Sequence, residues 1–110
     1  MMADTHKVLG QNAPAATTLT DLYTVPSVTS AVTSTLSVCN RAASNATFRL
    51  SIAIGGAADT PAQYIYFDET VPANKTWMAT VGFSLAVTDK VRVYASSSNL
   101  SFNLFGVEIT

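Results

Sequence analysis

The amino-acid sequence predicts an all-β protein, an antiparallel β-sandwich or jelly roll of about eight short strands. First, apolar residues recur at every second position over most of the chain. Second, Thr, Ser and Val occupy the places where a helix would carry Glu, Lys and Leu. Third, turn-forming residues separate the alternating runs at intervals of roughly 10 to 15 residues.

The chain has the size of a single domain. Its 110 residues are 48% hydrophobic and only 12% charged, whereas charged residues usually make up about 25% of a globular chain. A chain of this length buries roughly 65% of the surface that its unfolded form exposes, so one core suffices. We expect residues 1–6 to form a mobile N-terminal arm and residues 7–110 to form a single β-sandwich domain.

Two weaker strand candidates come first, at residues 7–10 and 19–25, with Asn12-Ala-Pro14 between them and Pro26 after the second. The next two are clearer. Residues 31–40 place Val32, Leu36 and Val38 on one side, and residues 48–54 place Phe48, Leu50, Ile52 and Ile54 on one side. The small polar residues 41–46 between these strands predict a hairpin.

Residues 55–61, with Gly55, Gly56 and Pro61, form the strongest break in the chain. The run that follows, residues 63–70, carries apolar groups on both faces because four large apolar residues stand consecutively from Tyr64 to Phe67. We hypothesise that one face of this strand lies under a neighbouring subunit.

Three more strands complete the chain. Residues 76–85 alternate with Trp77, Ala79, Val81, Phe83 and Leu85 inward, and Gly82 predicts a bend. Residues 91–95 alternate again. In the last strand, 100–109, the apolar parity changes beside Gly106, so a β-bulge there is expected to keep both apolar sets inward.

Composition excludes several classes of function. Six basic and seven acidic residues leave a net charge of −1, and this removes the positive surface that nucleic-acid binding needs. No apolar run reaches the length that spans a bilayer, and the first residues lack the basic-then-apolar plan of a signal peptide. We therefore expect no nucleic-acid partner, no membrane partner and no Sec-dependent export.

We expect no enzyme activity, no cofactor and no metal site. With a single cysteine, Cys39, and a single histidine, His6, the chain has neither an intrachain disulfide nor the usual Cys/His zinc site. Asp68 and Glu69 are adjacent, so on a strand they point to opposite faces rather than flanking a substrate. Asp59 and Asp89 lie in turns, where bonds to the backbone explain them, and Cys39 is expected to pack as a small hydrophobe.

The candidate interface residues are Tyr64, Tyr66, Arg92 and Tyr94. The two tyrosines of strand 63–70 belong to the segment with two apolar faces, and Tyr94 lies on the polar parity beside Arg92. Trp77 falls on the inward parity and is expected in the core. With Trp77, the three tyrosines also form the possible stacking platform of a carbohydrate-binding module, which is an alternative function.

A low-charge β domain with apolar residues on both faces of one strand is typical of a subunit that covers surface in an assembly. We expect a homo-oligomer with closed cyclic symmetry, a trimer.

The sequence resembles small all-β virion proteins of tailed bacteriophages over nearly its whole length. The segments that carry the resemblance are Lys7 to Pro26, Ser37-Val-Cys-Asn-Arg41, Val71-Pro-Ala-Asn-Lys-Thr-Trp77, Asp89-Lys-Val-Arg-Val-Tyr94 and Ser101-Phe-Asn-Leu-Phe-Gly-Val-Glu108. The resemblance implies an accessory subunit that decorates or cements the capsid, or that belongs to the tail or its fibres.

The expected function is a structural virion protein that decorates or cements the phage head by adhesive contacts, after synthesis in the host cytoplasm. Its expected partners are copies of itself and the major capsid protein or another virion protein. The short single domain and the N-terminal arm favour the head, because such an arm can become ordered on a neighbour. A tail, baseplate or fibre adaptor and a carbohydrate-binding module that recognises the host surface are the alternatives.

Overall fold

Strands account for most of residues 3–110, which are the residues that the computed structural model describes. These residues form nine strands and two short 3₁₀ helices. The strands are β1 (Asp4–Asn12), β2 (Thr20–Thr24), β3 (Ser30–Asn40), β4 (Ala46–Ala53), β5 (Tyr64–Val71), β6 (Thr76–Thr80), β7 (Ser84–Leu85), β8 (Lys90–Ala95) and β9 (Leu100–Ile109). The helices η1 (Ile54–Gly56) and η2 (Pro61–Gln63) lie between β4 and β5.

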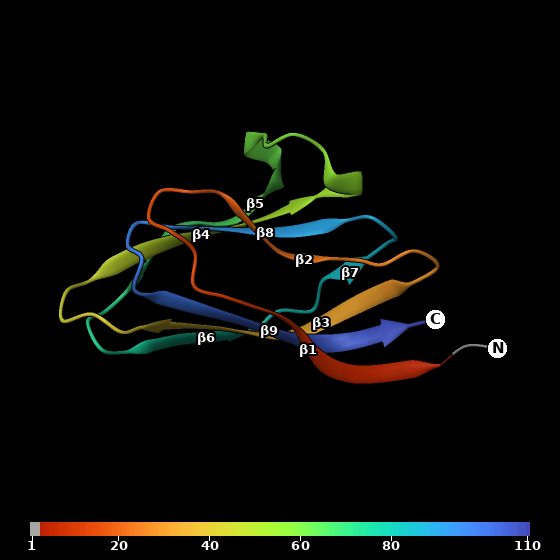
Figure 1. Cartoon of the computed structure of the whole chain (residues 1–110), viewed down its shortest axis with the longest axis horizontal. Coiled ribbons are helices and arrows are strands. Elements are labelled where there is room, and N and C mark those ends of the chain that lie inside the picture. Colours follow the sequence, from red (N-terminus) through yellow and green to blue (C-terminus); the bar gives the residue numbers. More distant parts are fainter. Residues whose placement is uncertain (1–2) are drawn as a thin grey trace.

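The strands form two layers, as Figure 1 shows. Sheet A has the order β1-β9-β3-β6, with β7 also beside β3, and sheet B has the order β2-β8-β4-β5. Four antiparallel pairs are nested along the chain: β4 with β5, β3 with β6, β2 with β8 and β1 with β9. This nesting across two sheets is the topology of a jelly roll, so the predicted fold class is confirmed.

The predicted hairpin between the third and fourth strands is wrong. β3 lies in sheet A and β4 lies in sheet B, so residues 41–45 cross from one sheet to the other. Both edges of β3 are already occupied, by β9 on one side and by β6 and β7 on the other. Alternation in the sequence indicates which side of a strand is buried, but it does not specify which strand lies beside it.

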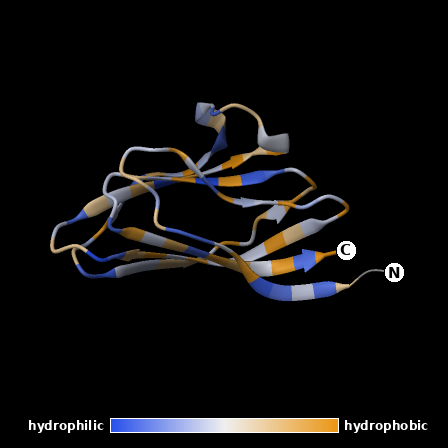
Figure 2. Cartoon of the chain, in the orientation of Figure 1, coloured by the Kyte–Doolittle hydropathy of each residue, from blue (hydrophilic) through white to orange (hydrophobic). Residues whose placement is uncertain are grey.

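The core lies between the sheets, and Phe48 is at its centre. The Phe48 ring centroid lies 5.0 Å from that of Trp77, 5.9 Å from that of Phe102 and 6.0 Å from that of Tyr66. Phe48 and Tyr66 come from sheet B, whereas Trp77 and Phe102 come from sheet A. These edge-to-face and tilted contacts therefore join the two layers. Figure 2 shows the alternation of hydrophobic and hydrophilic residues along the strands that produces this arrangement.

The parity predicted for residues 76–85 is confirmed, and the strand is interrupted around Gly82, between β6 and β7. Val81 and Leu85 are buried, and Trp77, Ala79 and Phe83 pack against the core. The buried hydroxyl of Thr33 accepts a hydrogen bond from the Phe83 amide and donates one to the Val81 carbonyl. The bend is therefore tied to β3 by one side chain.

The predicted inward position of Ile54 is wrong. Ile54 is 79% exposed, whereas Ser51 and Ala53, expected on the outer side, are fully buried. The reason is that residues 54–63 fold back over the outer face of sheet B, where the Arg92 guanidinium holds the carbonyls of Gly56 and Ala57. Small residues on that outer face are thus covered by the chain itself.

The predicted bulge in the last strand is also wrong. The register shifts lie in its two neighbours, between Val8 and Gly10 of β1 and between Thr33 and Thr35 of β3. β9 keeps its parity through Gly106, which is buried so closely that a Cβ there would lie 2.4 Å from the Val32 carbonyl oxygen. Phe105, Val107 and Ile109 therefore lie on the outer face of sheet A.

Glu108 takes the inward position instead, and it joins the two sheets. The Tyr23 hydroxyl of β2 donates a hydrogen bond of 2.6 Å to Glu108 Oε2, and Lys7 Nζ lies 3.2 Å from Glu108 Oε1. The hydrogen bond from Tyr23 is the main cause that lowers the pKa of Glu108, and burial raises the pKa of the Tyr23 phenol.

Residues 4–6, expected to belong to an N-terminal arm, are the first residues of β1 and pair with residues 107–109 of β9. The Ala3 amide and the Thr110 carbonyl are joined by a 2.8 Å hydrogen bond. The length of β9 supplies backbone partners for these residues, so the arm does not separate from the sheet at residue 7. Residues 1 and 2 of the expected arm lie outside the described residues.

Asn40 connects the loops at one end of the sandwich. Its side chain is buried, and its Nδ2 donates to the carbonyls of Ser44 at 2.8 Å and Val71 at 3.0 Å. Its Oδ1 accepts from the Ala42 amide at 3.0 Å. One amide group therefore satisfies backbone groups of both the β3–β4 and the β5–β6 connections.

We predict that Asn40→Ala lowers the free energy of unfolding by about 2–4 kcal/mol, because it leaves several buried backbone groups without partners. Asn99→Ala, at an exposed turn residue, is the control and is expected to change stability by no more than about 0.5 kcal/mol. Urea unfolding followed by tryptophan fluorescence measures both. Equal stability of the two variants would contradict the anchoring role of Asn40.

We predict that Glu108 contributes stability that is present above its ordinary pKa of 4.5 and is lost as pH falls through its lowered folded pKa. Glu108→Gln should therefore be less stable than the natural protein near neutral pH, and the difference should shrink towards about pH 3. Denaturant unfolding across this range tests it, with the exposed Glu69→Gln as control. A constant difference at every pH would refute this role.

Candidate interaction surfaces

Three of the four predicted interface residues lie on the outer face of sheet B. Tyr64 and Arg92 pair with Ser51 from either side, and Tyr94 pairs with Arg49. Tyr66 points the other way, because it pairs with the buried Leu50 and its ring contacts the core. The structure thus brings Tyr64, Arg92 and Tyr94 to one face and places Tyr66 beneath it, where its ring centroid is 4.8 Å from that of Trp77.

Arg49 lies at the centre of this face, although no sequence pattern indicated a role for it. Its guanidinium carbon lies 4.0 Å from the ring centroid of Phe67 and 4.6 Å from that of Tyr94. Its Nε donates to Asp68 Oδ1 at 2.8 Å. The guanidinium is therefore held by two aromatic rings and one carboxylate, and the hydrogen bond to Asp68 raises the pKa of Arg49.

A β-bulge in β5 makes this contact possible. The register of β4 and β5 shifts between Phe48 and Leu50, so that Phe67 and Asp68 both stand opposite Arg49. Asp68 has a φ of 53°, in the left-handed region that aspartate tolerates better than most residues. The register of a bulge depends on both strands, so the sequence of β5 alone did not indicate it.

Tyr64 extends the aromatic surface towards η2. Its ring centroid lies 5.2 Å from that of Phe67, in an edge-to-face arrangement. Its hydroxyl donates a 2.8 Å hydrogen bond to Asp59, and burial together with this bond raises the pKa of Tyr64. Beside these rings, Ile65 is 47% and Phe67 is 58% exposed. The rim of sheet B therefore presents apolar surface next to an arginine whose charge is already paired.

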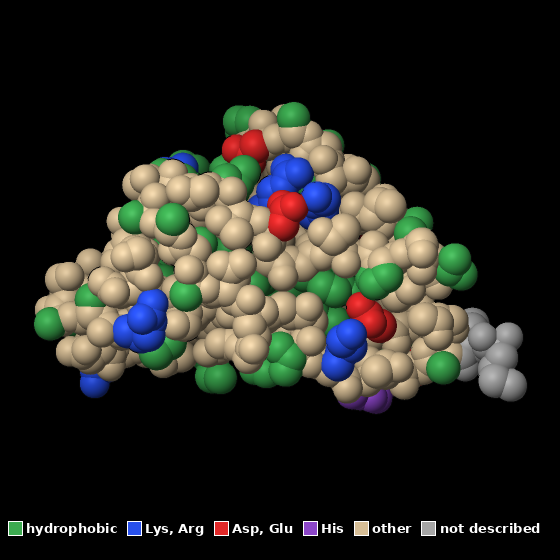
Figure 3. All heavy atoms as spheres, viewed as in Figure 1, with side chains coloured by type: hydrophobic (Ala, Val, Ile, Leu, Met, Phe, Trp, Pro, Cys, Tyr) green, Lys and Arg blue, Asp and Glu red, His purple; other side chains and the backbone are tan. Residues whose placement is uncertain are grey.

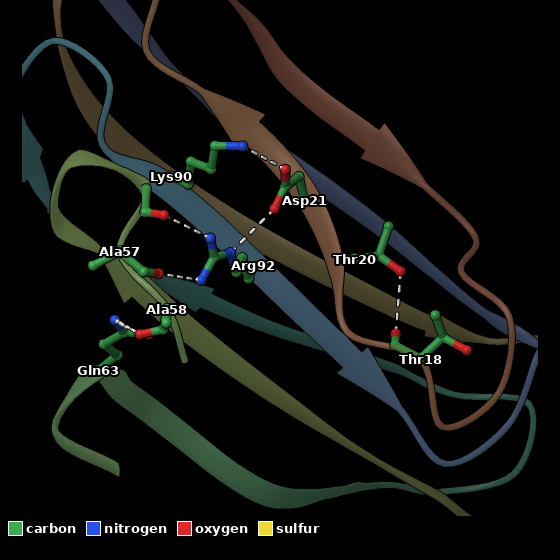
Figure 4. Close-up of polar contacts among 9 residues, drawn as sticks. Thr18, Thr20, Asp21, Ala57, Ala58, Gln63, Lys90 and Arg92 are labelled. Atoms are coloured by element: carbon green, nitrogen blue, oxygen red, sulfur yellow. Dashed lines mark hydrogen bonds and ion pairs between the residues drawn. The ribbon is translucent and has the colours of Figure 1, made fainter. Parts of the chain in front are cut away.

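Arg92 binds backbone groups of residues 54–63 and the side chain of Asp21, as Figure 4 shows. Its guanidinium donates to the carbonyls of Ala57 at 2.6 Å and Gly56 at 3.1 Å, and to Asp21 Oδ1 at 3.2 Å. Lys90 Nζ donates to the other oxygen of Asp21 at 2.8 Å, which is the main cause that lowers the pKa of Asp21. Arg92 thus fastens residues 54–63 to β8.

Asp89 supports the same segment from the end of the sandwich. Its carboxylate accepts hydrogen bonds from the amides of Gly55 and Ala86, both at 2.9 Å. The expectation that backbone bonds explain Asp89 is confirmed. Asp59, by contrast, receives the Tyr64 hydroxyl.

A second surface lies on the outer face of sheet A. We define the sheet A patch as Val8, Val32, Phe105 and Val107, which cross-strand pairing places side by side on β1, β9 and β3. Val8 is 42% and Val32 is 39% exposed. The predicted common side of Val32, Leu36 and Val38 is wrong, because the register of β3 shifts between Thr33 and Thr35 and turns Val32 outward. Phe105 and Val107 were predicted inward, although their uninterrupted alternation with Leu104 and Gly106 was a usable signal.

Charged side chains are few, and seven of the thirteen form ion pairs within residues 3–110. Figure 3 shows a surface that is mostly uncharged, with basic and acidic groups gathered in a few places. The ion pairs join Lys7 to Glu108, Arg49 to Asp68, and both Lys90 and Arg92 to Asp21. These surfaces can therefore bind a partner through burial and hydrogen bonds more than through net charge.

Among residues 3–110, no group of three or more His, Cys, Asp or Glu side chains is arranged to hold a metal ion. No helix in that range has the length and apolar character that crossing a membrane requires. An open hollow of about 350 Å³ lies beside the end of β1, and it is lined by Gln11, Asn12, Ala13, Ser101, Phe102 and Asn103.

We predict that Arg92→Met frees residues 54–63 and lowers the free energy of unfolding by about 1–3 kcal/mol, because two carbonyls and Asp21 lose a charged donor. Hydrogen exchange of the amides in residues 54–63 should become faster. Arg49→Met is the matched control on the same face, since Arg49 contacts β5 and β8 rather than this segment. The prediction fails if both variants exchange equally in residues 54–63.

No protein-family model matches the chain, and no curated protein sequence matches it. Its fold is similar to that of a chain in the structure of the infectious bursal disease virus Gx strain, with a TM-score of 0.55 and 13% identity over 99% of this chain and 32% of the viral chain. It spans about a third of the length of that viral chain. A chain in the acid-stable capsid structure of Helicobacter pylori bacteriophage KHP30 is also similar, with a TM-score of 0.48 and 14% identity over 100% of this chain and 94% of the phage chain.

Proposed function

We propose that this protein is a structural subunit of a virus particle, and that it decorates or cements the head of a bacteriophage. Its partners in this proposal are copies of itself and the major capsid protein. The observation that carries the proposal is the exposure of apolar side chains on the outer faces of both sheets. The proposal includes a virion location and no catalytic activity.

Outer faces of an antiparallel sandwich are normally polar, because only the inner faces are buried. Here large apolar residues are exposed on β1, β3, β5 and β6 as well as in loops. They are Val8, Val28, Val32, Ile54, Ile65, Phe67, Met78 and Val87. Clustered exposed apolar surface usually marks a contact with another macromolecule, and a structural subunit has several such contacts.

The distribution of charge favours adhesion to protein. The ion pairs of Arg49, Lys90 and Arg92 are internal to the chain, so these side chains are committed to the fold. Contacts that rely on apolar burial keep their strength when ionic strength changes. A cementing subunit needs that property.

The fold is compatible with this role. The match to a chain in the structure of infectious bursal disease virus, at a TM-score of 0.55, supports the proposal at the level of the fold alone. Jelly rolls also occur in lectins and other proteins, so the fold by itself does not identify a function.

In the proposed mechanism the subunit binds adjacent shell proteins and raises the free energy needed to separate them. Because it binds the assembled shell and not its separated parts, it stabilises the assembled state by mass action. The homotrimer expected from the sequence is one arrangement that would satisfy this mechanism, and it stays a prediction.

The carbohydrate-binding alternative receives less support. Trp77 packs on Phe48 and Tyr66 in the core, and one ring face of Tyr94 is occupied by the Arg49 guanidinium. A sugar ring would need such aromatic faces to be accessible. The tail, baseplate or fibre adaptor differs from a head subunit in number, since a tail holds few copies and a head holds hundreds.

We predict that particles lacking this protein rupture at a lower temperature and at a milder osmotic shock than complete particles. Purified protein added back to them should restore resistance. Quantitative mass spectrometry of complete particles should find hundreds of copies per particle. Unchanged rupture without the protein would rule out cementing, and a copy number of about a dozen or fewer would favour the tail.

A further inference from the structure

The outer face of sheet A has no covering segment among residues 3–110, and in this respect it differs from sheet B. On sheet B, residues 54–63 fold back so closely that Ser51 and Ala53 are fully buried. On sheet A, Val8 and Val32 remain about 40% exposed and Met78 remains 64% exposed. Sheet A therefore presents a broad open face.

The residues of this face lie in regular cross-strand rows. One row runs from Val8 through Phe105 and Thr35 to Thr80. The next contains His6, Val107, Val32 and Ser84. On the other side of the first row lie Gln11, Asn103, Ser37 and Met78. The apolar sheet A patch is thus flanked by hydroxyl and amide groups.

We propose that a second copy of this chain covers the outer face of sheet A, with the two faces packed against each other about a two-fold axis. This inference rests on the self-association included in the proposed function, and it assigns that association to one surface. Face-to-face packing is the ordinary way in which two β-sheets cover each other.

The area of the face agrees with such a contact. Three long strands, and a fourth position that β6 and β7 share along β3, at about 4.8 Å spacing and about 30 Å in length, give a footprint of roughly 600 Å² for one copy. Stable protein–protein interfaces of standard size bury about 800 Å² per partner, with a range that extends somewhat lower. The contact is therefore large enough to be specific and small enough to be weak in dilute solution.

The charge of the face favours an identical partner. Among the residues that strand pairing within 3–110 places on this face, Asp4 is the only carboxylate, no Lys or Arg is present, and the one imidazole is that of His6. Asp4 lies at the end of β1 opposite Ile109, away from the middle rows. An interface of this symmetry places the same patch on both sides, so charges in its middle would repel their own copies. Rows of valine, phenylalanine, serine and threonine have no such conflict.

The symmetry of the proposed contact also specifies the number of copies. A face that meets its own copy forms a closed pair, whereas a trimer needs two different surfaces in each contact. In the proposed pair the two-fold axis passes near the middle row of the face, in which Thr35 lies beside Phe105. On this argument the protein forms a pair through sheet A, and the trimer expected from the sequence would require another surface.

Sedimentation of the purified protein at increasing concentration tests the proposal. The natural chain should change from one to two copies, and Val32→Lys should weaken the pair by roughly 100-fold or more, because each pair carries the charge twice. Ile65→Lys is the matched control: Ile65 is 47% exposed and lies on β5 of sheet B. This control should pair like the natural chain.

Crosslinking adds a geometric readout. In a Cys39→Ser background, Thr35→Cys should form a disulfide-linked pair on mild oxidation, and Thr70→Cys on the exposed outer side of β5 should not. Far-ultraviolet circular dichroism confirms that each variant keeps its β structure.

A monomer at every concentration, a mass of three chains, or equal effects of Val32→Lys and Ile65→Lys would overturn the proposed pair. Failure of the proposed pair and failure of the proposed function give different results. A monomer that still binds particles in hundreds of copies refutes only the pair. A pair formed through sheet A that is absent from particles refutes only the virion role.

Discussion

In each sheet, every second side chain points inward and is buried against the inward side chains of the other sheet. The rest of this structure depends on that packing. Phe48 of sheet B contacts Trp77 and Phe102 of sheet A, and the inward residues of all the long strands surround this contact. Once alternate residues are committed to the interior, the remaining set must face outward. Because 48% of the residues are hydrophobic, more of them exist than this thin interior accommodates. The excess lies on the outer faces, so the fold and the exposed apolar surface have one origin.

Much of the fold followed from local alternation, and the errors arose where partners far apart in the sequence decide the outcome. The inward set of residues 76–85 and the interruption at Gly82 needed only the periodicity of one strand. The β3–β4 connection was predicted wrongly because strand neighbours depend on long-range pairing. Phe105 was placed inward because apolar residues were assumed to be buried, although Glu108 takes the inner side with Tyr23 as its partner. The Arg49 cluster required a bulge in β5 that neither strand indicates alone.

The two outer faces differ in how far the chain itself covers their apolar residues. Sheet B covers part of its outer face with residues 54–63, which Arg92 and Asp89 hold through their backbone groups. It also places the Arg49 guanidinium between Phe67 and Tyr94, so that an ion pair and two rings share one site. Sheet A has no comparable device in the described residues, and its rows of valine, serine and threonine stay open. The uncovered sheet is therefore the one on which the proposed pair is formed.

Modest contacts suit a subunit that acts in many copies. A strongly adhesive face would associate with any apolar surface before it reached the correct site, whereas a face of limited area becomes effective only at high local concentration. A shell supplies that concentration, since each bound copy places its free surfaces beside those of the next. The internal pairing of Arg49, Lys90 and Arg92 contributes to the same result, because charges committed within the chain attract few unrelated partners. In the proposed function, specificity therefore comes from the repetition of shape and not from any single strong contact.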